Sequence, residues 1–190
     1  MNTPAHVIIN LLVLGKGKET KHQLAIAAGA LLPDVPMFGF YFFEKIIRKI
    51  PEYVIWTHQY HQVSWQNIFD AFHSLPVIGI GLAWSLYARN HLGVLLFSSM
   101  LLHVAGDFPL HHDDAHRHFF PLSDWRFESP VSYWDPRYYG EVAASLEILV
   151  VIVSCLVLFS RYTSSIQRGL VGMVGVSYMM YFGYVWWVWG

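Results

Sequence analysis

The chain has 190 residues, enough for one ordinary domain. Hydrophobic residues make up 55% of it and charged residues only 13%, about half of the ~25% found in a soluble domain, so part of the surface is expected to face lipid. The net charge of −1 gives no electrostatic basis for binding nucleic acid, and the single cysteine, Cys155, excludes an intrachain disulfide framework.

The first apolar stretch is short. Residues 4–14 are apolar apart from His6 and Asn10. As a helix they would cover only ~16 Å of a hydrocarbon core that is ~30 Å thick. We therefore expect a helix that enters the membrane partway or packs inside a bundle.

The second apolar stretch, residues 22–43, contains Asp34 between two prolines. Because proline is disfavoured inside a helix, the pattern predicts a helix over about 22–32, then a turn that carries Asp34, then a second segment. Residues 44–66 are more polar and predict an interfacial or extramembrane segment.

Residues 72–88 and 91–106 are two apolar runs joined by two residues. This pattern predicts a helical hairpin with a very short tip. His73 would begin the first helix, and His103 and Asp107 would end the second. An antiparallel pair would therefore bring His73 close to Asp107.

The C-terminal part, within 142–190, follows a polar, aromatic-rich loop over residues 108–141 and predicts two spanning helices, at 142–160 and 169–189. We therefore expect an all-α fold: a single integral membrane domain over residues 1–190, built as a polytopic bundle of about four to six helices. Its His/Asp-rich loop would lie at one membrane surface.

Potential metal ligands are most concentrated in residues 103–118, which hold five histidines and three aspartates. Imidazole nitrogens and carboxylate oxygens are ligands of divalent metals. His103 and Asp107 are spaced i, i+4 and share one helix face, so we predict that they hold a metal together. A proline at position 109 ends that helix, so the loop would deliver His111, and the other loop residues are equally explained as a solvated polar segment.

Three more candidates come from other segments. Asp34 needs a partner or a metal in apolar surroundings, although it would also serve as an N-cap of the next helix. His73 and His6 are either ligands or buried histidines bonded to the backbone. If the helices alternate up and down, all three reach the same end as His103 and Asp107.

The opposite end would carry short basic loops, which tend to be cytoplasmic, so the His/Asp end is predicted outside the cytoplasm. The basic residues concerned are Lys16, Lys18, Lys21, Arg89, Arg161 and Arg168.

Several motifs occur in a particular order: His6 in the first helix, Leu32-Pro33-Asp34, Phe72-His73-Ser74, His103-x-x-x-Asp107, and a run from His118 through Phe-Pro-Leu-Ser-Asp to Phe127. In this order, over roughly residues 1–130, the chain resembles the membrane-bound metal-dependent hydrolases, bacterial inner-membrane proteins thought to be distantly related to zinc-dependent phospholipase C. The resemblance implies metal-binding roles for His6, Asp34, His73, His103, Asp107 and His118.

These observations favour a hydrolase in which zinc activates a water molecule, and in which Asp107 or Asp34 bridges, orients or acts as general base. A lipid or lipid-linked phosphoester would suit a site beside the bilayer. A membrane di-iron or haem redox protein that uses the same histidines is one alternative, and a non-enzymatic membrane subunit or scaffold is another. The sequence names no protein partner.

Overall fold

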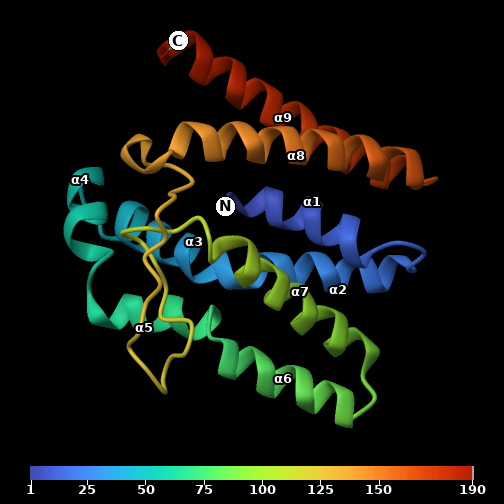
Figure 1. Ribbon diagram of the computed structural model, residues 1–190, viewed down its shortest axis with the longest axis horizontal. Helices are drawn as coiled ribbons and strands as arrows, with labels where there is room; N and C mark the ends of the chain where they lie inside the picture. Colours follow the sequence, from blue (N-terminus) through green and yellow to red (C-terminus); the bar gives the residue numbers. More distant parts are fainter. Residues whose placement is uncertain (190) are drawn as a thin grey trace.

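The computed structural model describes residues 1–189, which are helices, connections and one long loop, without a strand (Figure 1). The all-α prediction is confirmed for these residues. The α-helices are α1 (Thr3–Leu14), α2 (Thr20–Leu31), α3 (Val35–Phe42), α4 (Glu52–Val54), α5 (Val63–Phe72), α6 (Leu75–Tyr87), α7 (His91–Asp107), α8 (Gly140–Arg161) and α9 (Ser165–Trp189).

Helical segments are more numerous than the four to six expected. The difference arises mainly between the second and third apolar stretches, where the polar segment is itself partly helical. It contains α4 and two single π-helical turns, Phe43–Ile47 and Ile55–Gln59. Buried Phe40, Ile55 and Phe69 pack together there, and this small apolar cluster stabilises short helices that would be marginal alone.

The predicted turn at Asp34 is present, but it is a helical turn. Asp34 lies in a 3₁₀ turn, Leu32–Asp34, that links α2 to α3 with helical backbone on both sides. Pro33 is the second residue of the 3₁₀ turn, and Pro36 is the second residue of α3. At the start of a helical segment the missing N–H group costs little. The helical run therefore continues over Thr20–Ile47.

Three helical runs are long and apolar enough to cross a membrane: Thr20–Ile47, Val63–Tyr87 and Gly140–Arg161. The last is α8, with a mean hydropathy of 2.7, which agrees with the span predicted at 142–160. The first helix, α1, is short as expected. Residues 169–189 are helical within α9, but over the described residues this helix is not among the three runs.

The hairpin of α6 and α7 is present as predicted, and α7 also lies along α2 (Figure 1). The two helices approach closely at Gly29, where any Cβ atom would collide with the carbonyl oxygen of Leu96. Beside this contact, the Asn10 amide donates to the Ser99 hydroxyl at 2.8 Å, and that hydroxyl donates to the Ile26 carbonyl at 2.6 Å. Small and polar side chains thus fix the register of α1, α2 and α7, as in membrane helix packing.

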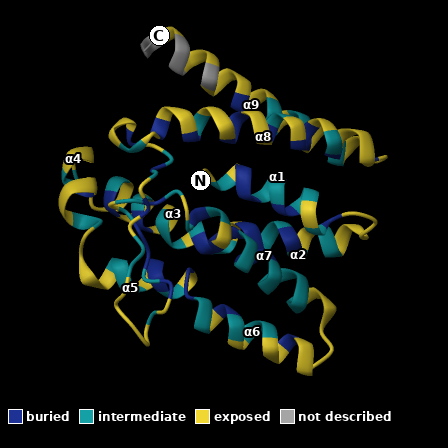
Figure 2. Ribbon diagram, in the orientation of Figure 1, coloured by how far each residue is buried: buried dark blue, intermediate teal, exposed yellow. Residues whose placement is uncertain are grey.

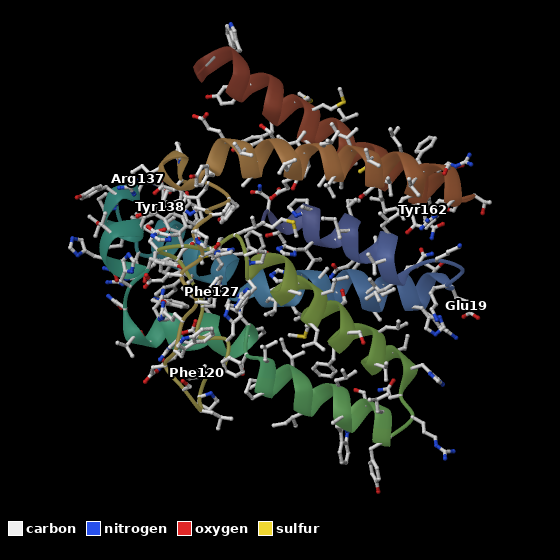
Figure 3. The ribbon with its side chains drawn as sticks, in the orientation of Figure 1. Glu19, Phe120, Phe127, Arg137, Tyr138 and Tyr162 are labelled. Atoms are coloured by element: carbon white, nitrogen blue, oxygen red, sulfur yellow. The ribbon has the colours of Figure 1, made fainter. Side chains whose placement is uncertain are left out.

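The molecule has two distinct ends. The α1–α2, α6–α7 and α8–α9 connections lie at one end, marked by Glu19 and Tyr162 in Figure 3, and the long loop 108–139 covers the other, where Arg137 and Tyr138 lie. Buried residues gather between α1, α2, α7 and this loop, whereas α6 and α8 turn exposed faces outward (Figure 2).

The long loop is tied to the junction of α5 and α6. Arg117 donates to the fully buried carboxylate of Asp70 from its backbone N–H (3.0 Å) and from Nε (2.5 Å). The Leu75 amide donates to the His118 carbonyl at 2.8 Å. The Ser74 hydroxyl, which also caps α6, donates to the Phe120 carbonyl. These contacts place the loop histidines beside the helix ends.

Candidate metal centre

Four side chains from separate segments converge at the loop end of the bundle. Asp34 comes from the 3₁₀ turn, His73 from the end of α5, and His103 and Asp107 from the last turns of α7. One donor atom from each lies within 4.8 Å of the others. We call these four residues the metal group. They can hold a metal ion, and the four were predicted to lie together.

Both histidines of the metal group have a fixed orientation. Nδ1 of His73 lies 2.9 Å from the Phe69 carbonyl, and Nδ1 of His103 lies 2.8 Å from the Ala30 carbonyl. A carbonyl only accepts, so each Nδ1 carries the proton and donates it. Each Nε2 atom therefore offers a lone pair, and both are buried without a hydrogen-bond partner in the described part of the chain. This is the arrangement of a metal-binding histidine.

The distances within the metal group suit a shared metal. Two ligand atoms bound ~2.1 Å from a tetrahedral ion lie ~3.4 Å apart. Nε2 of His103 is 3.6 Å from Oδ1 of Asp34 and 2.9 Å from Oδ2 of Asp107, and Nε2 of His73 is 4.0 Å and 3.9 Å from the same oxygens. The nitrogen and oxygen donors thus surround one point.

The second oxygen of each carboxylate has other partners. The Thr3 hydroxyl donates to Oδ2 of Asp34 at 2.5 Å. Oδ1 of Asp107 lies 2.9 Å from Nε2 of His6 and 3.4 Å from Nε2 of His111, and the Met1 amino group is 2.7 Å away. Asp107 therefore connects the metal group, on its Oδ2 side, to His6 and His111 on its Oδ1 side.

The structure places the remaining predicted ligands around this core. His6 stacks on His103 with ring centroids 3.6 Å apart. His111 pairs with Asp114 at 2.9 Å. Burial disfavours its charged form, but the nearby Asp107 and Asp114 carboxylates outweigh burial and raise the pKa of His111 to about 9.

His118 lies outside the metal group, which is the set of possible metal ligands found within the described residues. It is buried against the Phe108 ring, with centroids 5.3 Å apart, and neither ring nitrogen has a hydrogen-bond partner within residues 1–189. Burial, together with the neighbouring His116, lowers the pKa of His118 to about 4, so its imidazole is neutral at pH 7 and able to accept.

One local expectation is wrong. His73 does not begin a helix but ends α5, and Ser74 caps the following helix, α6. The Ser74 side chain accepts from the Val77 amide, so the new helix starts after His73. The predicted closeness of His73 to Asp107 nevertheless holds, because the α5–α6 junction lies at the same end as the end of α7.

Two residues that lie beside the metal group, His116 and Asp70, were not in the predicted ligand set. His116 stacks on His73 with centroids 3.8 Å apart, and its Nδ1 is 3.4 Å from Oδ1 of Asp70. A lone carboxylate amid apolar residues, one turn before His73 on the same helix, was the available sequence signal for Asp70.

The metal group opens onto a hollow of about 140 Å³, lined by residues of the α1 start, the Asp34 turn, α5 and the long loop. The hollow also touches Phe38, a side chain of α3 that is 57% exposed. Comparisons with family models, with curated proteins and with solved structures find no match to this chain.

Proposed function

We propose that the protein is a membrane-embedded, metal-dependent hydrolase and that its metal is zinc. The observation that carries the proposal is the metal group, with two histidine nitrogens that lack hydrogen-bond partners among the described residues and two carboxylate oxygens. Zinc accepts imidazole and carboxylate ligands, and catalytic zinc sites use three protein ligands of this kind with one position left open.

His73, His103 and Asp107 are the three residues that we assign to holding the metal. Their side chains are 0–3% exposed. The Asp34 side chain is 21% exposed and lines the hollow, so it is placed to orient a water molecule and accept its proton. A bound zinc ion supplies Lewis acidity to that water and to a phosphoryl or acyl oxygen.

A lipid or lipid-linked phosphoester is the substrate that we propose. The support is the position of Phe38, whose exposed ring lies on a run apolar enough to span a membrane and also borders the hollow. A lipid chain could therefore follow the apolar surface while its polar part enters the hollow. We also propose an inner-membrane location in a bacterium, with the site on the extracytoplasmic side, since the basic connections gather at the opposite end.

Elemental analysis of the detergent-purified protein tests the metal. We expect zinc in a fixed ratio to the chain, and loss of that zinc in the double variant His103→Ala/Asp107→Ala. His91→Ala is the matched control, because His91 begins the same helix and is exposed. Full zinc content in the double variant would sink the proposal, and iron in place of zinc would favour a redox protein.

Hydrolysis is tested separately on zinc-loaded protein with a panel of lipid phosphoesters in mixed micelles. We expect phosphoester cleavage by the wild type, and loss of at least a hundredfold in rate for Asp34→Asn, on the order of a positioned general base. Zinc-loaded protein that leaves every ester intact would point instead to a non-enzymatic subunit.

A further inference from the structure

A second hollow adjoins the one above the metal group. Its volume is about 430 Å³, within the ~300–1,000 Å³ of ordinary ligand pockets. We call it the aromatic cleft. It is lined by Met37, Trp56, Tyr60, His61, Asp113, Asp114, Tyr133 and Trp134. Four of these residues, Met37, Tyr60, Asp114 and Tyr133, also line the hollow over the metal group, so one molecule can occupy both.

The walls of the cleft are aromatic and come from two distant parts of the chain. Trp56 lies in the π-helical turn Ile55–Gln59 and Tyr60 follows it, with ring centroids 6.1 Å apart. Tyr133 and Trp134 belong to the long loop. Trp56 and Trp134 are 42% and 51% exposed, so parts of both rings are free. Faces of such rings attract cations.

The floor of the cleft is acidic. Oδ2 of Asp114 pairs with His111 and accepts from Nε1 of Trp134 at 3.3 Å, while its Oδ1 is buried with no hydrogen-bond partner in the described chain. Asp113 beside it is exposed. Burial, and then the charge of Asp114, raise the pKa of Tyr133, so this phenol stays neutral in a negative field.

The basic groups near the cleft already have partners. Its lining includes no lysine or arginine among the residues that the structure describes. Arg137 pairs with Asp135 at 2.6 Å, and Arg126 lies 3.7 Å from Asp70. His111 pairs with Oδ2 of Asp114 at 2.9 Å. The cleft therefore combines aromatic ring faces with the exposed carboxylate of Asp113.

We propose that the aromatic cleft binds a cationic amine, best a quaternary ammonium, on the substrate whose ester bond is cleaved at the metal group. An anionic group would be repelled by the exposed carboxylate of Asp113, and a purely apolar group would gain no attraction from that carboxylate. Ring faces and carboxylates together are the usual way to recognise such cations. The statement that this cation belongs to the substrate rests on the proposed hydrolase function, but cation binding by the cleft can be tested without it.

The experiment uses the detergent-purified full chain, with and without chelator, titrated with choline chloride and observed by saturation-transfer NMR of the ligand methyl protons. The uncharged carbon isostere, 3,3-dimethyl-1-butanol, is titrated in parallel. We expect saturable choline binding that needs no metal, and binding of the isostere that is at least five times weaker, on the order of one cation–π contact.

Two variants locate the site. Trp134→Leu is expected to weaken choline binding roughly five- to thirtyfold through lost ring contact. Asp113→Asn is expected to weaken it severalfold at low salt and less at high salt, because the charge is exposed. The matched controls are Trp125→Leu and Glu128→Gln, an equally exposed tryptophan and an exposed carboxylate of the same loop outside the cleft, and both should bind choline as the wild type does.

Equal binding of choline and its isostere, absence of saturable binding, or unchanged binding by Trp134→Leu would overturn the inference. Its failure is distinguishable from failure of the proposed function. Zinc binding and ester hydrolysis without choline binding would remove only the cleft assignment. If the protein binds choline but no zinc, the cation site is supported and the proposed zinc hydrolase is rejected.

Discussion

Nε2 of His103 and Oδ1 of Asp34 lie 3.6 Å apart, although one belongs to α7 and the other to the turn between α2 and α3. No hydrogen bond to another described residue satisfies this nitrogen. A buried nitrogen left without a partner costs free energy, so a metal ion bound to this nitrogen would offset that cost, with Asp34 beside it to orient a water molecule. The predictions below follow from this arrangement and from the contacts that hold it.

Thr3 is expected to orient Asp34, the proposed proton acceptor. Its hydroxyl donates to Oδ2 of Asp34 and leaves Oδ1 directed toward His103. Replacement by the isosteric Thr3→Val removes only the donor, so the rate of phosphoester hydrolysis by zinc-loaded protein should fall roughly ten- to hundredfold, while the zinc content stays unchanged. Thr163→Val, at an exposed threonine of the opposite end, should leave the rate unchanged, and equal effects of the two variants would contradict the role given to Asp34.

Asp70 should stabilise the long loop far more than its solvent-facing counterpart. Asp70 is fully buried and accepts two hydrogen bonds from Arg117, whereas Asp124, which also pairs with Arg117, is 89% exposed. Asp70→Asn should lower the free energy of unfolding by about 3–5 kcal/mol, and Asp124→Asn by about 0–1 kcal/mol. Thermal unfolding and protease cleavage within the loop measure the difference, and similar values for both would refute it.

Gly29 should be intolerant of a side chain. A Cβ atom there would meet the Leu96 carbonyl and lie 2.8 Å from Cβ of Ser99, which would push α2 away from α7 and move the Ala30 carbonyl off His103. We expect Gly29→Ala to reduce both thermal stability and zinc affinity.

Gly39→Ala is the control for this prediction, because a Cβ atom at Gly39 meets no atom within 4 Å. Alanine in place of an α3 glycine should be neutral or stabilise by about 0.5–1 kcal/mol. A Gly29→Ala protein as stable as Gly39→Ala would mean that the two helices can separate without cost.

Chelation should lower the thermal unfolding midpoint. A metal that binds only the folded chain stabilises it by RT ln(1 + [L]/Kd), or about 2.7 kcal/mol at a free concentration of 100 Kd. The midpoint should therefore rise with added zinc until the site is saturated. The variant His103→Ala/Asp107→Ala should show no such dependence, and a zinc-dependent midpoint in that variant would place the metal elsewhere.

Cysteine labelling tests the proposed orientation. In a Cys155→Ser background, Glu128→Cys in the long loop and Lys18→Cys in the α1–α2 connection both present exposed positions. A membrane-impermeant maleimide added to spheroplasts should label Glu128→Cys and not Lys18→Cys. The reverse pattern would put the metal group on the cytoplasmic side.

Local rules accounted for much of the candidate site. The i, i+4 spacing of His103 and Asp107 follows from helix geometry alone, and the short tip between α6 and α7 forces His73 toward the same end. These two inferences were correct because each depends only on the regular geometry of an α-helix. The turn expected at Asp34 is a helical one, because prolines near the start of helical segments interrupt a helix much less than prolines inside one.

The sequence by itself determined that the chain is helical, apolar enough for a membrane, and equipped with His/Asp donors at one end, since composition and helical period are local properties. Only the tertiary structure decided which donors share a point. The loop has no period from which its side-chain directions follow. Its place is set by the buried pair of Asp70 and Arg117 and by hydrogen bonds to the α5–α6 junction, contacts between segments far apart in sequence.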